Sequence, residues 1–125
     1  MINDNTDNPA ALPLLDESAL EQISAGLTAE IVAELLASFL DDLKQRIAAI
    51  EQARADNRLE ILAEQAHALK SSTGSYGARR LQHYCRDLEQ QARAGASEKA
   101  LATAVTAVEC GNQTIQRYSE RIENQ

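Results

Sequence analysis

Apolar residues recur at intervals of three and four along most of this chain, and that spacing places them on one face of an α-helix. The longest regular run predicts a helix that Thr28 caps and that continues as far as Ala53; its apolar positions are Ile31, Leu35, Phe39, Leu43, Ile47 and Ile50. Both prolines lie before residue 14 and aromatic residues make up only 3% of the chain, so helix is favoured over strand throughout.

The same spacing predicts four further helices. A short one follows Asp16 and closes at Gly26, and a long one begins at an Asp56 cap and ends near residue 75. Another helix is predicted over residues 78–94, and the side chains that face inward are those of Leu81, Tyr84, Cys85, Leu88 and Ala92. The last helix starts at Ser97, and its apolar stripe is Leu101, Ala104, Val105, Val108, Ile115, Tyr118 and Ile122. Short connections between the four long helices predict an all-α fold, an antiparallel up-and-down four-helix bundle with a short additional N-terminal helix.

The chain divides into a leader and one domain. Residues 1–15 are rich in Asn and Asp and hold both prolines, which predicts a flexible leader, and residues 16–125 form the helical bundle. No stretch approaches the roughly 18 to 20 apolar residues of a membrane span, and the N-terminus is acidic, so we expect neither membrane insertion nor secretion. Cys85 and Cys110 make no CxxC pair, which favours reduced thiols in the cytoplasm. Cys85 lies on an apolar stripe, whereas Cys110 falls off its stripe and is expected to be partly exposed.

Charge is distributed unevenly along the chain. The net charge of −7 argues against nucleic acid as a partner, because phosphates are bound by clustered Lys and Arg. The segment 70–93 nevertheless holds five basic residues against two acidic ones. A local positive field there would attract an acidic partner or a phosphoryl group. The alternative is an ordinary solvated helix face.

Signatures of enzymes and metal sites are absent from the sequence. There is no glycine-rich phosphate loop, GxSxG or HExxH motif. By helical phase, His83 points nearly opposite to Cys85, so the two are not expected to share a metal ion. We expect His83 to face solvent, with the rim of a partner surface as an alternative. A small helical enzyme is therefore disfavoured, and no metal site is predicted.

His67 is the strongest candidate for chemistry. It lies about 130° from the centre of the apolar stripe of its helix, which comprises Leu59, Leu62, Ala66, Leu69, Thr73 and Tyr76. Its neighbours one and two turns away are Ala63, Lys70, Ser71 and Gly74. Three of these four are small, so the imidazole is expected to stand above a flat, open patch, and Lys70 adds a positive charge beside it.

The segment from His67 to Glu89 resembles the histidine-containing phosphotransfer (HPt) family. The family pattern is His-x-Leu-Lys-Gly-Ser followed by an apolar-Gly-Ala turn, a Leu and later Cys and Leu-Glu positions. This sequence matches it at His67, Leu69, Lys70, Ser72, Tyr76, Gly77, Ala78, Leu81, Cys85, Leu88 and Glu89. It departs at Ser71, where most members have Gly; serine is still small, and its hydroxyl can bond a phosphoryl oxygen. His-Ala-Leu-Lys-Ser-Ser is also similar to free-standing phosphorelay proteins of the LuxU type.

The resemblance implies roles for individual residues. His67 would carry a phosphoryl group, and Lys70 would balance its charge unless it is simply a solvated lysine. Contact with the phosphate or partner is expected from Ser71, Ser72, Gly74 and Ala63, although Gly74 and Gly77 could merely end the helix. Glu89 would orient the imidazole through its inner nitrogen, or could instead pair with Arg86 or Arg93.

The resemblance also implies partners. The phosphoryl group would pass between aspartates in the receiver domains of a hybrid sensor kinase and of a response regulator, in a multistep two-component phosphorelay. Mg²⁺ is expected on the receiver, and no cofactor in this chain. Without a nucleotide-binding motif, the chain is expected to be a phosphocarrier rather than an ATP-dependent kinase, and a monomer. The alternative is a phosphorylation-independent helical adaptor that binds signalling partners.

Overall fold

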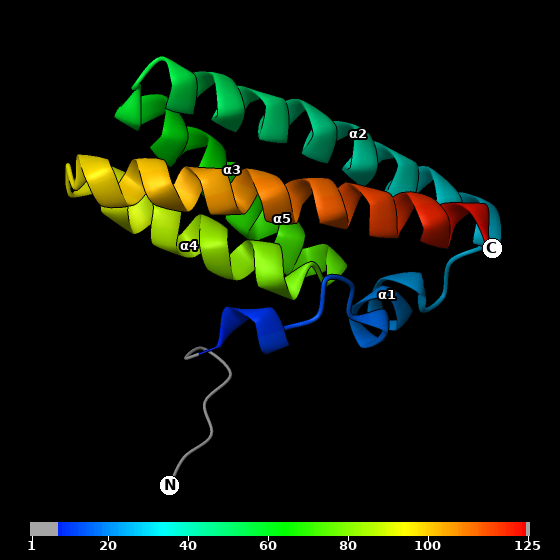
Figure 1. Ribbon diagram of the computed structural model, residues 1–125. Coiled ribbons are helices and arrows are strands. Elements are labelled where there is room, and N and C mark those ends of the chain that lie inside the picture. Colours follow the sequence, from blue (N-terminus) through cyan, green and yellow to red (C-terminus); the bar gives the residue numbers. More distant parts are fainter. Residues whose placement is uncertain (1–7, 125) are drawn as a thin grey trace, which may run out of the picture.

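Helices account for nearly all of the regular structure. The computed structural model describes residues 8–124, and within that range it contains no strand (Figure 1). The prediction of an all-helical fold is confirmed. The elements are the short 3-10 helix η2 (Pro9–Ala11) and the α-helices α1 (Glu17–Ser24), α2 (Ala29–Ala55), α3 (Leu59–Tyr76), α4 (Arg79–Arg93) and α5 (Ser97–Glu123).

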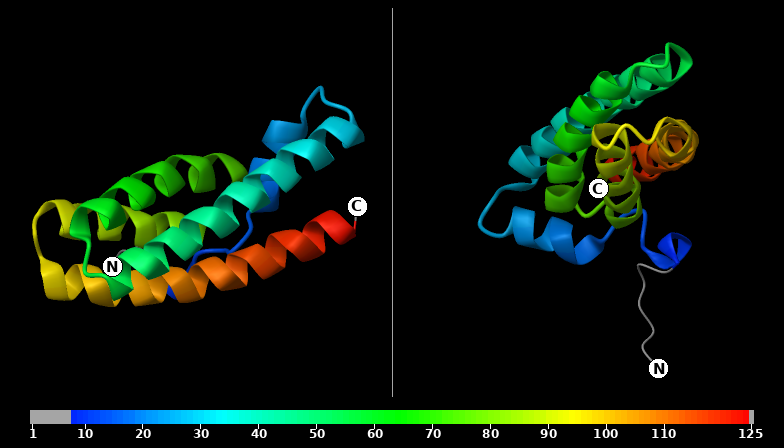
Figure 2. Two further views of the ribbon diagram at one scale, coloured as in Figure 1. Left: turned by 90° about the horizontal axis from the view of Figure 1, so that it is seen from above. Right: turned by 90° about the vertical axis from the view of Figure 1, so that its left-hand side faces the viewer.

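The four long helices surround one apolar core. α2 packs against α3 and α5, and α4 also packs against α3 and α5 (Figure 2). α2 and α5 have 27 residues each, whereas α3 has 18 and α4 has 15, so the longer pair extends past the shorter one. α1 lies at the end of α3 and contacts both α3 and α2. The largest apolar side chains that are completely buried in the core are Leu36, Leu43, Ile50, Leu62, Leu69, Leu81, Leu88 and Tyr118.

The predicted cap at Thr28 is confirmed and the one at Asp56 is wrong, while α1 follows Asp16 as predicted. The Asp16 side chain accepts a hydrogen bond from the Ser18 backbone N–H, and the Thr28 side chain accepts one from that of Ile31. Asp56 does not begin α3. Because α2 continues to Ala55, Asp56 ends α2 instead, and its backbone N–H donates to a carbonyl of the helix it closes.

The inward face of α5 differs from the predicted one. Val105 is 43% exposed, while Cys110, which was expected to be partly exposed, is buried. The core-facing positions include small residues, namely Ala100, Ala104, Ala107 and Gly111. A Cβ at Gly111 would overlap the Ile47 side chain, so close approach of α2 and α5 selects small residues over aliphatic ones. Ile31, predicted on the inner stripe of α2, is likewise 44% exposed.

The leader is docked where the structure describes it. η2 lies against α4, and Arg80 fixes the following residues: its Nε donates to the Leu12 carbonyl at 2.8 Å and its backbone N–H to that of Pro13 at 3.1 Å. Leu15 is buried in the core. Residues 8–15 therefore lie against the bundle, because Arg80 of α4 donates to backbone carbonyls there. Residues 1–7 lie outside the described range.

Gly77 connects the end of α3 to both α1 and α4. It ends α3 with a left-handed φ of 88°, which glycine adopts without steric cost. Its carbonyl accepts a hydrogen bond from the Asp16 backbone N–H at 2.9 Å. A Cβ here would lie only 2.7 Å from the Asp16 carbonyl oxygen, so the contact requires glycine. None of the helices within residues 8–124 is both long and apolar enough to cross a membrane.

Candidate functional site

His67 lies midway along α3 and its side chain is 64% exposed. The residues beside it on the inner face, Ala66 and Leu69, are fully buried. The helical phase therefore directs the imidazole outward while the backbone that carries it is anchored in the core. The predicted exposure of His67 is confirmed.

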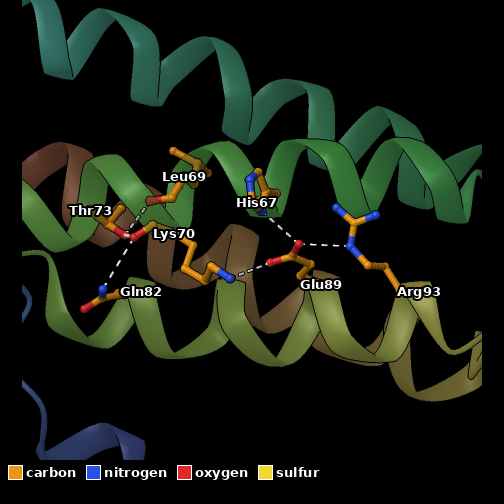
Figure 3. Close-up of polar contacts among 7 residues, drawn as sticks. All are labelled: His67, Leu69, Lys70, Thr73, Gln82, Glu89 and Arg93. Atoms are coloured by element: carbon orange, nitrogen blue, oxygen red, sulfur yellow. Dashed lines mark hydrogen bonds and ion pairs between the residues drawn. The ribbon is translucent and has the colours of Figure 1, made fainter.

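Glu89 of α4 reaches the imidazole. Its Oε2 lies 2.9 Å from Nδ1 of His67, across the contact between α3 and α4 (Figure 3). The Glu89 side chain is only 11% exposed, so this carboxylate is largely enclosed beside an open imidazole. The expected contact between Glu89 and the inner ring nitrogen is present.

Two cations hold the same carboxylate. Nζ of Lys70 lies 2.8 Å from Oε1 of Glu89, and Nε of Arg93 lies 2.9 Å from Oε2 (Figure 3). The hydrogen bond from Lys70, followed by those from Arg93 and His67, lowers the pKa of Glu89 to about 2. Glu89 thus stays ionised at neutral pH and can only accept hydrogen bonds.

The ionised carboxylate determines the tautomer of His67. Because Glu89 accepts, Nδ1 of His67 must carry the ring proton, an assignment that follows from the hydrogen-bond partner. Nε2 is then the nitrogen with a free lone pair. None of the hydrogen bonds within residues 8–124 engages Nε2. In the neutral imidazole the free nitrogen is thus Nε2, on an exposed side chain beside a carboxylate that Lys70 and Arg93 hold.

The small residues expected around His67 occupy different environments. Ser71 is exposed, and Ser72 is half-buried with its Oγ 3.4 Å from the Leu69 carbonyl. Gly74 lies inside α3 and does not end it; a Cβ there would lie 2.5 Å from Nε2 of Gln82, whose amide covers this turn. Ala63 is only 3% exposed and lies in the wall of a groove between α3 and α4.

The surroundings of two residues on this face were only partly predicted from the sequence. Arg93 was considered only as a rival partner of Glu89, yet it and His67 bind the same carboxylate oxygen. Its position four residues after Glu89 on one helix was the available signal. His83 was expected to face solvent, but its side chain is only 10% exposed. Two grooves meet at His83, and the docked leader lines one of them with Leu12 and the other with Pro9. Helical periodicity does not predict this docking of the leader.

Both cysteines are buried free thiols. Burial raises the pKa of Cys85 to about 12 and also raises that of Cys110, so neither is poised as a nucleophile. Among residues 8–124, no three His, Cys, Asp or Glu side chains are grouped as metal ligands would be.

Comparison with known families identifies the class of protein. The Hpt domain model matches residues 34–124, and the chain belongs to this family of histidine phosphotransfer proteins, which act as phosphocarriers in phosphorelays. It is 28% identical over 107 residues to the phosphorelay protein LuxU of Vibrio vulnificus strain YJ016, covering 86% of this chain and 93% of the relative. LuxU of Vibrio harveyi is 32% identical over 81 residues, covering 65% of this chain and 71% of that one.

Solved structures share the fold. Histidine-containing phosphotransfer protein B of Pseudomonas aeruginosa PAO1 superposes with a TM-score of 0.81 at 23% identity, covering 90% of this chain and 97% of that one. The HPT domain of a hybrid histidine kinase from Shewanella gives a TM-score of 0.77 at 15% identity, with coverage of 94% and 98%. The arrangement of the helices is therefore that of other histidine phosphotransfer domains.

Proposed function

We propose that His67 carries the phosphoryl group of a multistep phosphorelay on its Nε2 atom. The observation that carries this proposal is the contact between Nδ1 of His67 and the ionised Glu89. It leaves Nε2 with its lone pair, on a side chain that is 64% exposed. An incoming phosphoryl donor can therefore approach the nucleophile without any rearrangement of the helices.

The reaction balances with the groups present. The Nε2 lone pair attacks phosphorus in the aspartyl phosphate of a receiver domain, the N–P bond forms, and the P–O bond to the aspartate breaks. The aspartate leaves as a carboxylate, and the ring keeps its proton on Nδ1. The positive charge that develops on the imidazole is stabilised by Glu89, which is already ionised and oriented. Transfer to a second receiver aspartate reverses these steps.

Lys70 and the neighbouring small residues complete the site. Lys70 lies one turn from His67 and contacts Glu89 in the unphosphorylated protein. Once the phosphoryl group adds negative charge beside it, its ammonium can turn to a phosphoryl oxygen. Ser71, Ser72 and Gly74 follow on the same helix and are the proposed contacts for the phosphoryl group or for the docked partner.

The partners are the receiver domains of a hybrid sensor kinase and of a response regulator. Mg²⁺ is supplied by the receiver, and this chain does not phosphorylate itself from ATP. A monomer leaves the α3 and α4 face open for docking, and the cytoplasm keeps Cys85 and Cys110 reduced.

The contacts of α2 and α4 with both α3 and α5 support the description of the fold as an antiparallel up-and-down four-helix bundle.

The proposal is tested by following labelled phosphate from a phosphorylated receiver to this protein. Wild type is expected to gain an acid-labile, base-stable label. His67→Gln is expected to gain none while keeping its helical circular dichroism spectrum, because the side chain lies outside the core. His83→Gln, the variant at the other histidine, still becomes labelled. Binding of receivers without any transfer of label to wild type would instead support a phosphorylation-independent adaptor.

A further inference from the structure

A groove with basic side chains in its walls lies on the α3 and α4 face beside the phosphotransfer site. It has a volume of about 270 Å³, and its walls are Leu12, Lys70, Arg79, Gln82, His83 and Arg86. Lys70 lines this groove. It also belongs to the Glu89 cluster, which consists of Glu89 and the three residues that contact its carboxylate, His67, Lys70 and Arg93 (Figure 3). Arg86 lies one helical turn before Glu89 on α4. The groove is therefore continuous with the surface that a phosphoryl donor must cover.

The groove is lined by three cations and no carboxylate. Two of these cations have acidic partners: Lys70 contacts Glu89 at 2.8 Å, and Arg79 contacts Asp16 at 3.2 Å. Arg86 differs, because none of the ion pairs within residues 8–124 includes it; its hydrogen bond is to an imidazole nitrogen. The positive charge of Arg86 thus remains unneutralised at the wall of the groove.

His83 holds Arg86 in place. Nη2 of Arg86 lies 3.0 Å from Nδ1 of His83, and the opposite ring nitrogen lies 3.3 Å from Oδ2 of Asp87. The arginine can only donate, so Nδ1 of His83 accepts and Nε2–H faces Asp87. With the ring only 10% exposed, the guanidinium is bonded to a fixed acceptor. Fixing a charged group before binding lowers the entropy lost on binding.

The other side of His67 has the opposite character. A groove of about 630 Å³ is lined there by Leu59, Glu60, Ala63, Glu64, Ala92 and Arg93. Its two glutamates precede His67 on α3, whereas the cations of the first groove follow it. An acidic surface is attracted to one side and repelled from the other, so the charges select one orientation of a partner over the reverse.

We propose that the groove at Arg86 is the docking site for a carboxylate side chain of the partner protein that exchanges phosphate with His67. The inference rests on the proposed function and adds the means by which the partner is oriented. The carboxylate binds Arg86 while the reacting atoms meet at His67 Nε2. Arg86 therefore acts on docking and takes no part in the chemical step.

The test uses a receiver domain that transfers phosphate to the wild-type chain. Transfer is measured as a function of receiver concentration for wild type, Arg86→Gln, Arg86→Glu and Arg86→Lys. Arg121→Gln is the matched control, because Arg121 lies on α5 and pairs with Glu17 of α1. Labelling by phosphoramidate, a small donor without a docking surface, is measured in parallel.

We expect Arg86→Gln to raise the KM for the receiver by about three- to tenfold with kcat unchanged, and Arg86→Glu to raise it further. Arg86→Lys, which keeps the charge, and Arg121→Gln should stay within about twofold of wild type. Raising the salt concentration should weaken docking of wild type more than that of Arg86→Gln. The phosphoramidate reaction should be unaffected by Arg86→Gln.

Three results would overturn the inference. An unchanged KM for Arg86→Glu would remove the docking role. A fall in kcat, or slower labelling by phosphoramidate, would assign Arg86 to the chemistry. If Arg121→Gln raised the KM as much as Arg86→Gln does, the increase would come from the change in net charge and not from the groove. These outcomes differ from failure of the proposed function, in which wild type itself takes no label and the inference falls with it.

Discussion

Nδ1 of His67 and Oε2 of Glu89 lie 2.9 Å apart, although 22 positions separate the two residues in the sequence. The pair joins an exposed imidazole on α3 to an enclosed carboxylate on α4. Since Lys70 and Arg93 hold that carboxylate in its ionised form, the imidazole has one fixed proton and one free nitrogen. The packing of two helices thus determines which ring nitrogen is free.

Removal of Glu89 should slow phosphotransfer without unfolding the protein. In Glu89→Ala, His67 loses the acceptor that orients its ring, and we expect the rate of transfer from a receiver to fall roughly ten- to hundredfold. Glu89→Gln can still accept from Nδ1 through its amide oxygen and should lose less. Quenched-flow transfer assays measure both, and equal rates for Glu89→Ala and wild type would remove the positioning role.

Lys70 should be required for its charge. Lys70→Ala removes the cation nearest to the incoming phosphoryl group and is expected to slow transfer roughly ten- to hundredfold. Lys70→Arg should retain most of the rate. Lys99→Ala provides the comparison, because Lys99 is an exposed lysine in the first turn of α5. A rate for Lys70→Ala as high as that of Lys99→Ala would contradict the assignment.

The Glu89 cluster should make stability depend on pH in the acid range. Folding lowers the pKa of Glu89 from its ordinary value of 4.5 to about 2, mainly through Lys70. The unfolded chain therefore binds more protons between these values, and the stabilisation is present above pH 4.5 and is lost as the pH falls toward 2. The difference in free energy of unfolding between wild type and Glu89→Gln, from urea titrations, should shrink across that window. A difference that is constant with pH would argue against an ionised, bound Glu89.

Gly77 should be more sensitive to substitution than Gly95. Both have a left-handed φ, 88° and 72°, so alanine costs about 1–2 kcal/mol at either position. Gly95 has open space around the added Cβ, whereas at Gly77 it meets the Asp16 carbonyl oxygen at 2.7 Å. Gly77→Ala should therefore lower the free energy of unfolding by about 1–3 kcal/mol more than Gly95→Ala. The free energies of unfolding of the two variants are measured by urea titration. Equal losses of stability would mean that α1 moves to make room for the added Cβ at Gly77.

Helical periodicity was sufficient to predict the five α-helices and the exposure of His67. Local side-chain chemistry also predicted the cap at Thr28, because its hydrogen bond to the Ile31 backbone spans only three residues. Periodicity failed on α5, where the core face is built from alanine, glycine and Cys110 and the aliphatic residue Val105 faces outward. Small residues carry a weak hydrophobic signal, so Ala100, Ala107 and Gly111 were missed, although Ala104 and Tyr118 of the predicted stripe are buried.

Contacts between distant segments set the other limit. The sequence suggested that Glu89 could orient the imidazole or pair with Arg93, but the register of α3 against α4 lets one carboxylate do both. His83 lines two grooves together with Leu12 and Pro9 of the leader, which the Arg80 hydrogen bonds hold against α4. Neither relation is periodic in the sequence, and each needed the packed structure.

The most direct test of the central claim is to identify the phosphorylated atom. The protein is phosphorylated by a receiver, and ¹⁵N and ³¹P NMR spectra of the labelled imidazole are recorded under alkaline conditions, where phosphohistidine persists. The account predicts phosphate on Nε2 of His67, with the Nδ1 proton retained toward Glu89. Phosphate on Nδ1, on His83 or on a carboxylate would contradict it.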